Sequence, residues 1–345
     1  MPHPPVPTAN PVVVEITRGH LVESRHRGAL AVVDRTGSTV IGLGNIVAPV
    51  YPRSAIKLMQ ALPLIESGAA DRFGLTDAEI ALSVSSHNGE PQHVAAVQSM
   101  LGKAGLSEAD LECGPQLPAR DEDRCALLAR GEPPRRIHNN CSGKHAGMLA
   151  AAMHLGLERR GYVRHDHPLQ QRIRATMAEM TGTDLTTDRC GIDGCSVPTW
   201  AAPLEGWARA FASVATGRDL GADRRAAIER IRRAVAAHPF MVAGSGRFCT
   251  RVMEATGAAA FVKTGAEGVF CAALPDRGFG VALKIDDGAS RAAETLMAAV
   301  LCALGGLEGK ARAAVETLAR QPVTDRNGNP VGEMRASAEL RAALA

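Results

Sequence analysis

Aromatic residues are scarce in this sequence, and net charge is almost absent. Trp and Tyr occur twice each, and 39 Lys and Arg residues stand against 36 Asp and Glu residues. A nucleic-acid-binding protein needs a concentrated basic face and aromatic rings on which bases can stack. The arginines between positions 224 and 233 share one expected helix with Asp223 and Glu229, which is typical of a solvated surface. We therefore expect no nucleic-acid partner.

The sequence also lacks an apolar run long enough to cross a membrane. Its most apolar helix is expected over 292–304, and thirteen residues suit a buried core element better than a membrane span. Residues 1–11 hold four prolines before Pro11, so we expect a flexible tail there and neither a secretory signal nor a membrane anchor. Eight cysteines in such a chain are interpreted as reduced thiols, metal ligands or small buried side chains. These features predict a cytoplasmic protein without membrane contact.

No internal repeat or low-complexity linker divides the 345 residues, which are enough to bury a substantial core. Runs of β-branched and apolar residues predict strands near both chain ends. These strands are expected over 12–17, 30–34, 39–43, 261–264, 269–274 and 279–285. The pattern predicts an α+β fold with one antiparallel sheet formed from both chain ends, about 12–50 and 258–345, and a mainly helical region of about 51–257 inserted between them. Residues 12–345 would form a single unit.

Helices are expected through most of the inserted region. One begins near Ser54 and ends at Gly68, and Thr76 with Glu79 forms the capping box of another. Further amphipathic helices are predicted over 92–102, 168–181, 204–215 and 223–237. Residues 112–136, with prolines and mixed charge, are expected to be irregular.

Three short motifs indicate chemistry. Ser54 and Lys57 lie three residues apart, on one helical face, so the lysine can take a proton from the serine. S-x-x-K alone is more typical of a solvated helix start. The chain adds Ser86-His87-Asn88 in a turn and Lys263-Thr264-Gly265 on a strand. S-x-x-K, S-x-N and K-T-G occur in this order in serine β-lactamases and penicillin-binding proteins, so we expect the three to form one site.

Longer blocks extend the resemblance to nearly the whole chain. They are PRSAIK (52–57), SSHNGE (85–90), NNCSGKHAGM (139–148), CGIDGC (190–195) and VKTGAEG (262–268). With these blocks the sequence resembles the Rhizobium etli-type (class 3) L-asparaginases, which are built on the serine β-lactamase and penicillin-binding-protein fold. The resemblance implies a single catalytic unit that hydrolyses the side-chain amide of L-asparagine to L-aspartate and ammonia. It also implies a homodimer and a zinc ion near the active site.

Site residues are carried over from the resemblance position by position. Ser54 matches the nucleophile and Lys57 its base, while Ser86 and Lys263 match the second serine and lysine pair. Substrate contacts are expected from Arg53, His87, Asn88, Asp193, Thr264, Gly265 and Ala266. Cys141, Lys144 and Cys195 match the zinc ligands, although C-x-x-K by itself is more often packing, and a redox-sensitive contact between Cys141 and Lys144 is a third possibility.

The chemistry of these side chains suggests a role for each of them. Two lysines drawn together in a partly dry pocket each disfavour the other's charge, so one can be neutral and act as a base. The backbone N–H groups of Ser54 and Ala266 are the oxyanion donors that the fold analogy suggests. Arg53 either receives the substrate α-carboxylate or is a surface charge. His87 and Asn88 either orient the substrate or close the turn, and for His87 we favour the turn.

Two other functions remain open from the sequence. The first is another acyl hydrolase on the same fold, such as a glutaminase, β-lactamase or esterase. The second is a non-catalytic sensor of an amino acid or metal, against which the complete motifs argue.

Overall fold

The computed structural model describes residues 9–345. Most of the predicted tail, residues 1–8, lies outside this part. Asn10, near its start, donates a hydrogen bond to Asp286 and accepts one from the Asn45 N–H, each at 2.7 Å. The N-terminal segment is therefore tied to Asp286, in the C-terminal part of the sequence, immediately before the first strand.

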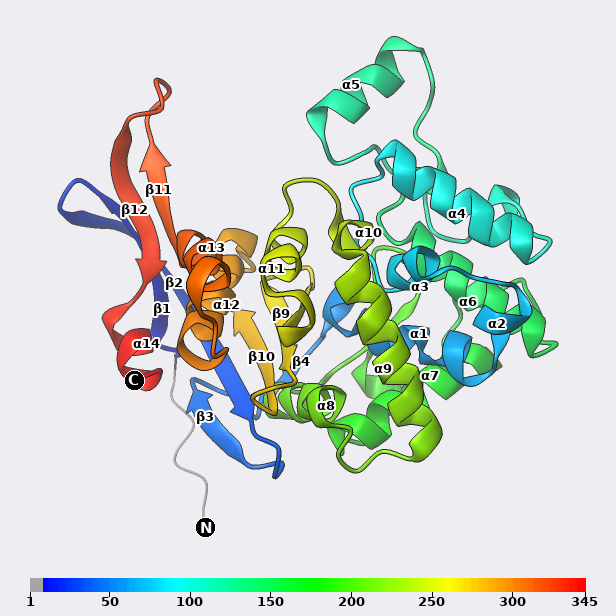
Figure 1. The fold of residues 1–345 in the computed structure, drawn as a ribbon, viewed down its shortest axis with the longest axis horizontal. Coiled ribbons are helices and arrows are strands. Elements are labelled where there is room, and N and C mark those ends of the chain that lie inside the picture. The colour runs from blue at the N-terminus through cyan, green and yellow to red at the C-terminus, as the bar shows by residue number, and fades with distance from the viewer. Residues whose placement is uncertain (1–8) are drawn as a thin grey trace.

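One antiparallel sheet of eight strands contains segments from both chain ends (Figure 1). Its order is β11-β12-β1-β2-β10-β9-β8, and β3 pairs with β2 off this path. The bounds are β1 Val12–Arg18, β2 Leu21–Val33, β3 Thr39–Leu43, β8 Phe261–Thr264, β9 Val269–Leu274, β10 Phe279–Ile285, β11 Arg320–Thr324 and β12 Pro330–Ala336. The pairing of Leu30 in β2 with Leu283 in β10 joins the N-terminal and C-terminal parts.

Four shorter strands lie outside this sheet. Those of the first pair are β4 Pro49–Val50 and β7 Ala202–Pro203, and those of the second are β5 Cys190–Ile192 and β6 Pro198–Trp200. Both pairs are antiparallel.

The helices form most of the region between the two parts of the sheet (Figure 1). They are α1 Lys57–Glu66, α2 Ala69–Arg72, α3 Asp77–Ser83, α4 Pro91–Lys103, α5 Asp121–Ala129, α6 Ser142–His154, α7 Pro168–Thr181, α8 Leu204–Thr216, α9 Ala222–Ala237, α10 Pro239–Ala243 and α11 Phe248–Thr256. Three more helices follow β10 in the sequence: α12 Ser290–Leu304, α13 Gly309–Ala319 and α14 Ala338–Ala343. Short 3-10 turns include η1 Arg53–Ile56, which leads directly into α1.

Helix α8 packs closely on the sheet because β10 carries a glycine where they meet. A Cβ atom on Gly280 would lie 2.0 Å from the backbone nitrogen of Ala212 and 2.1 Å from the carbonyl oxygen of Ala208. No side chain fits in that space. The apolar faces of α8 and of strands β8, β9 and β10 can therefore form one continuous core with α1. The residues of α1 from Lys57 to Ile65 are all buried.

The α+β architecture predicted from the sequence is confirmed, and most predicted elements differ from the observed ones by a few residues at most. Thr76 and Glu79 form the predicted capping box. Three predictions were wrong in part. Residues 112–136 are not all irregular, because α5 lies within them, the helix predicted from Ser54 begins as a 3-10 turn, and β2 begins at Leu21 instead of Leu30.

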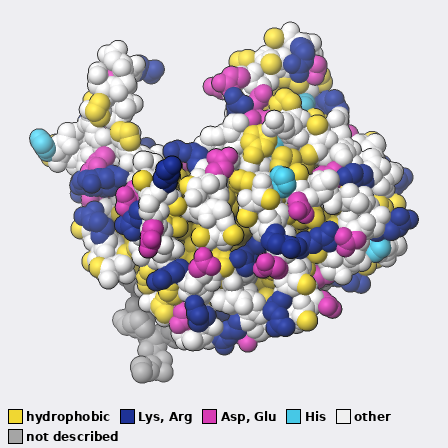
Figure 2. Space-filling model, viewed as in Figure 1, with side chains coloured by type: hydrophobic (Ala, Val, Ile, Leu, Met, Phe, Trp, Pro, Cys, Tyr) yellow, Lys and Arg dark blue, Asp and Glu magenta, His cyan; other side chains and the backbone are white. Residues whose placement is uncertain are grey.

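The arginines of α9 form a band on the face shown in Figure 2. Arg224 pairs with Glu66 and Glu179, and Arg230 pairs with Asp71. Arg224 and Arg230 of this band are thus ion-paired with neighbouring helices. Within residues 9–345, no helix combines the length and apolar character that a membrane crossing requires.

Candidate active site

The turn that begins the first motif is held in an unusual backbone conformation. Arg53 has a φ of +52°, a left-handed value that is uncommon for a residue with a side chain. The turn packs against the K-T-G segment so closely that a Cβ on Gly265 would lie 2.6 Å from the carbonyl oxygen of Pro52 and 3.3 Å from the Ala55 nitrogen. Strained backbone of this kind is often found at functional sites. Two motifs separated by about two hundred residues in the sequence are therefore in contact.

The Ser86 hydroxyl lies between two buried lysines. Lys263 Nζ is 2.8 Å from Ser86 Oγ, and Lys57 Nζ is 3.0 Å from the same atom. The exposed fractions of Lys57 and Lys263 are 0% and 1%. Lys57 also donates to the Ser85 carbonyl, and Lys263 to the Thr264 carbonyl at 2.9 Å. The structure thus brings residues of all three motifs together.

Ser54 is placed one turn before Lys57. Because η1 is a 3-10 turn, side chains three residues apart lie nearly above one another. The Ser54 side chain is half-buried and makes no hydrogen bond to any residue in the described range 9–345. Ser54 is thus a neighbour of the lysine and serine cluster without a fixed partner of its own.

Lys263 has the altered basicity that a base requires. Burial, followed by the positive charge of Lys57, lowers the pKa of Lys263 to about 7. An amine with this pKa is about half neutral at neutral pH, whereas an ordinary lysine is almost fully protonated. An amine that is neutral in about half of the molecules at neutral pH therefore lies 2.8 Å from a serine hydroxyl.

Both His87 and Asn88 are engaged inside the protein. The Gly89 N–H donates to His87 Nδ1 at 3.0 Å, so Nε2 carries the hydrogen and donates to Ser142 Oγ at 3.0 Å. Burial holds the pKa of His87 well below its usual value, so the ring is neutral. Asn88 donates to Glu90 and accepts from Arg247. These contacts are those of a turn that is closed by His87 and Asn88.

Glu90 connects three segments around this turn. Its carboxylate accepts hydrogen bonds from Asn88, from the Ser245 N–H and hydroxyl at 2.7 Å each, and from Arg120 at 2.9 Å. The segment that carries α5 is thereby tied to the S-x-N turn. Gly244 permits this arrangement, since a Cβ there would lie 2.4 Å from Glu90 Oε1.

Arg53 is paired with Asp193, so it is not simply a surface charge. Its Nε and Nη2 atoms lie 2.8 Å and 2.7 Å from the same oxygen, Asp193 Oδ1. Although burial opposes it, the charges of Lys144 and Arg53 lower the pKa of Asp193 and keep its carboxylate ionised. The pair presents both a cation and an anion beside the S-x-x-K turn.

Cys141, Lys144 and Cys195 also come together. Cys141 Sγ accepts from Lys57 Nζ at 3.0 Å, and Cys195 Sγ accepts from Lys144 Nζ at 3.0 Å. A hydrogen bond from Cys141, together with the charge of Lys144, lowers the pKa of Cys195 to about 5 despite its burial. The Cys195 thiolate in turn favours the charged form of Lys144 and raises its pKa. The cluster continues directly from the serine and lysine cluster through Lys57.

These three side chains fit a zinc site in donor type. Two thiols and an amine supply three protein donors, which would leave a fourth tetrahedral position open. The thiolate at Cys195 is the form that binds zinc, while Lys144 must first lose its proton. Within the described range, no group of three or more His, Cys, Asp or Glu side chains is arranged to hold a metal.

The K-T-G segment supplies backbone donors. Among the backbone hydrogen bonds of residues 9–345, neither the Ala266 N–H nor the Ser54 N–H has an acceptor. The N–H groups at the start of a helical turn have no partner within it. Thr264 Oγ1 is directed to the Gly265 carbonyl at 3.2 Å. Two free N–H groups thus flank the close contact between η1 and Gly265.

Sequence reasoning missed Arg247. It belongs to no recognised motif and lies in the loop between α10 and α11, yet its Nη1 lies 2.9 Å from Asn88 Oδ1 and 3.4 Å from the Ser86 carbonyl oxygen. Only a glycine-rich stretch, Gly244 to Gly246, marks the loop in the sequence.

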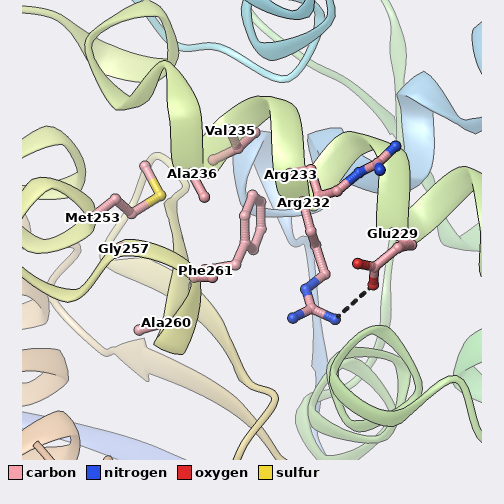
Figure 3. Close-up of a pocket in the computed structure, with 10 residues that line it drawn as sticks. Glu229, Arg232, Arg233, Val235, Ala236, Met253, Gly257, Ala260 and Phe261 are labelled. Carbon is pink, nitrogen blue, oxygen red and sulfur yellow. Dashed lines mark ion pairs between the residues drawn. The ribbon is translucent and has the colours of Figure 1, made fainter.

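A cavity between α9, α11 and β8 lies elsewhere (Figure 3). Its volume is about 50 Å³, and Arg232, Met253 and Phe261 are among the residues that line it. None of the predicted site residues belongs to its lining. We therefore base the candidate site on the hydrogen-bonded cluster and not on this cavity.

Comparison with solved structures gives matches at low sequence identity. Mglu in its native form is 16% identical, with 84% of this chain and 66% of that chain covered and a TM-score of 0.39. A penicillin-binding-protein homologue from Caulobacter crescentus is 15% identical, with 77% and 90% covered and a TM-score of 0.34. The chain thus spans about two thirds of the length of Mglu. No curated protein matches.

The cluster of buried serine and lysine side chains around the Ser86 hydroxyl is compatible with a hydrolase. The family match agrees with this class, because the model of the L-asparaginase II family matches residues 14–336. The chain belongs to the L-asparaginase II family, which confirms the family resemblance found in the sequence.

Proposed function

We propose that this protein is an amidohydrolase that converts L-asparagine to L-aspartate and ammonia, with Ser54 as nucleophile. The observation that carries the mechanism is the Ser86 hydroxyl held between Lys57 and Lys263. This arrangement connects a lysine beside the nucleophile to a second lysine that can be neutral at neutral pH. Ser-Lys pairs are a recognised way of activating a serine.

Proton transfer would run along these contacts. Lys263 takes a proton from Ser86, Ser86 takes one from Lys57, and Lys57 takes one from Ser54 as its oxygen attacks the amide carbon. One proton moves from Ser54 to Lys263 in total, and each of the other groups ends as it began. The reverse movement delivers the proton to the departing ammonia, and water then releases L-aspartate from Ser54 by the same route.

The remaining groups would bind the substrate and the transition state. The free N–H groups of Ser54 and Ala266 are placed to hold the oxyanion, and the loss of one such donor typically lowers the rate about 10²–10³-fold. The Asp193 carboxylate, fixed by Arg53, is suited to the α-ammonium group of an amino acid. Thr264 and Gly265 would shape the wall of the site opposite the S-x-x-K turn.

Cys141, Lys144 and Cys195 would hold the zinc ion that the family resemblance implies. A bound zinc ion would supply a fixed positive charge and a Lewis acid near the site. Through Lys57, which contacts Cys141, the ligands also help to position the base. The homodimer and the cytoplasmic location that we expect from the sequence belong to the same proposal.

A panel of substrates tests this function. Purified protein is incubated with L-asparagine, L-glutamine, a chromogenic lactam and a chromogenic ester, and ammonia or colour is measured. We expect ammonia from L-asparagine at the highest kcat/KM. Lactam or ester turnover without ammonia from L-asparagine would instead assign another acyl hydrolase, and binding without any turnover would assign a sensor.

A further inference from the structure

Arg247 lies beside the S-x-N turn and forms no ion pair with a carboxylate of the described residues. It is half-buried at the start of α11, and only its Nη1 atom makes hydrogen bonds, to the Ser86 carbonyl and to Asn88 Oδ1. Within residues 9–345 it forms no ion pair, whereas Arg53 and Arg120, the other arginines near the site, pair with Asp193 and Glu90. Its Nε and Nη2 atoms have no hydrogen-bond partner in that range.

The surroundings of Arg247 include positive groups, and the nearby Glu90 carboxylate is already bound by Asn88, Ser245 and Arg120. Burial is the main cause of the lowered pKa values of Lys263 and His87, and the nearby guanidinium of Arg247 lowers both further. Glu294 on α12 is close enough for the Arg247 charge to affect its pKa, but it forms no ion pair with it. A partly buried cation with a free donor edge, beside two lysines, is a site prepared for an anion.

The anion must be small and planar to use this edge. The Nε and Nη2 hydrogens of a guanidinium match the two oxygens of a carboxylate. Arg53, the other arginine near the nucleophile, already has its Nε and Nη2 on Asp193. We infer that Arg247, and not Arg53, receives the α-carboxylate of the amino-acid substrate and so sets the specificity of the site.

This inference rests on the proposed function, because it identifies the part of L-asparagine that Arg247 binds. Asn88 and the Ser86 carbonyl orient the guanidinium, so the S-x-N turn would position the substrate as well as the proton route. The α-ammonium would lie toward Asp193. An amide substrate without the α-carboxylate would lose the contact with Arg247 and keep the others.

The test compares two substrates that differ only in this group, L-asparagine and 3-aminopropanamide. We expect Arg247→Gln to lower kcat/KM for L-asparagine about 10²-fold, mainly through KM, and to change that for 3-aminopropanamide less than about threefold. Arg247→Lys, which keeps the charge, should recover part of the loss. Arg251→Gln, one helical turn further along α11, should leave both values unchanged. Equal losses on both substrates, or no loss on L-asparagine, would overturn the inference.

A binding measurement keeps the result independent of turnover. L-Aspartate is titrated calorimetrically into Ser54→Ala protein and into the Ser54→Ala, Arg247→Gln double variant, with thermal unfolding as the folding control. We expect about 10²-fold weaker binding to the folded double variant. Equal binding, or no binding to Ser54→Ala protein, would refute the role of Arg247. If wild-type protein does not hydrolyse L-asparagine but binding depends on Arg247, the proposed function fails and this inference stands.

Discussion

Lys263 Nζ lies 2.8 Å from Ser86 Oγ, and the charge that would normally sit on this amine is disfavoured by burial and by Lys57. Together with the contact from Lys57 Nζ at 3.0 Å, the Lys263 contact places the Ser86 hydroxyl between two amines. The first prediction concerns this hydroxyl.

Ser86→Ala should lower kcat about 10³-fold without unfolding the protein, because the proton route loses its central member. The neighbouring Ser85→Ala is a matched control, since the buried Ser85 hydroxyl has no hydrogen-bond partner among the described residues. Its activity and melting temperature should stay close to wild type. Steady-state kinetics and thermal unfolding measure both effects. If the two variants had the same activity, Ser86 would not be part of the route.

The pH dependence of kcat/KM should follow the Lys263 amine. With a pKa of about 7, this group is protonated below pH 7 and cannot accept a proton, so the rate should fall tenfold per pH unit on the acid side and level off above neutrality. Lys263→Arg, which stays protonated, should be inactive at every pH tested. A wild-type profile that is flat between pH 5 and pH 8 would rule out Lys263 as the base.

Removal of one thiol should release the zinc ion. Purified protein should contain about one zinc per chain, and Cys195→Ala should bind zinc at least tenfold more weakly, because it loses the donor that is already a thiolate. Cys302→Ala is the control, since Cys302 lies on α12 outside the cluster. Metal analysis and competition with a chelator give the affinities. An unchanged zinc affinity in Cys195→Ala would place the metal elsewhere.

Gly244→Ala should destabilise both the protein and the S-x-N turn. Its φ of +105° is unfavourable for alanine, and the added Cβ would lie 2.4 Å from Glu90 Oε1 and 2.8 Å from Asn88 Nδ2. We expect the unfolding free energy to fall by about 2–4 kcal/mol, with a loss of kcat/KM. Gly246→Ala, also at positive φ but with open space around its Cβ, should lose only about 1 kcal/mol. Equal losses in chemical denaturation would mean that Glu90 does not hold the turn.

The sheet of the catalytic unit could be predicted where apolar residues dominate a strand. β8, β9 and β10 are buried along nearly their whole length, and their ends agree with the prediction. The first half of β2 was missed because charged residues occupy every second position from Glu23 to Arg27. This part of the strand lies on an exposed part of the sheet. Helix α5 was missed for a similar reason, since acidic and basic residues fill it and only Leu127 is buried.

The sequence predicted which residues would meet at the site but not the contacts between them. Motif order indicated that Lys57, Ser86 and Lys263 would meet, and they do. No local pattern could show that both lysines share one serine, or that Lys57 also reaches Cys141, because these contacts depend on how α1, α6 and β8 pack. Arg247 was missed because its contacts with Ser86 and Asn88 depend on how the loop between α10 and α11 folds.

The most direct test of the account is a search for the covalent intermediate. Protein mixed with L-asparagine is quenched in acid within milliseconds, digested and analysed by peptide mass spectrometry, with Ser54→Ala treated in parallel. We predict an aspartyl ester on Ser54 and none in the variant. An aspartyl group on Ser86 or on another residue, or rapid ammonia release by the Ser54→Ala protein, would contradict the mechanism.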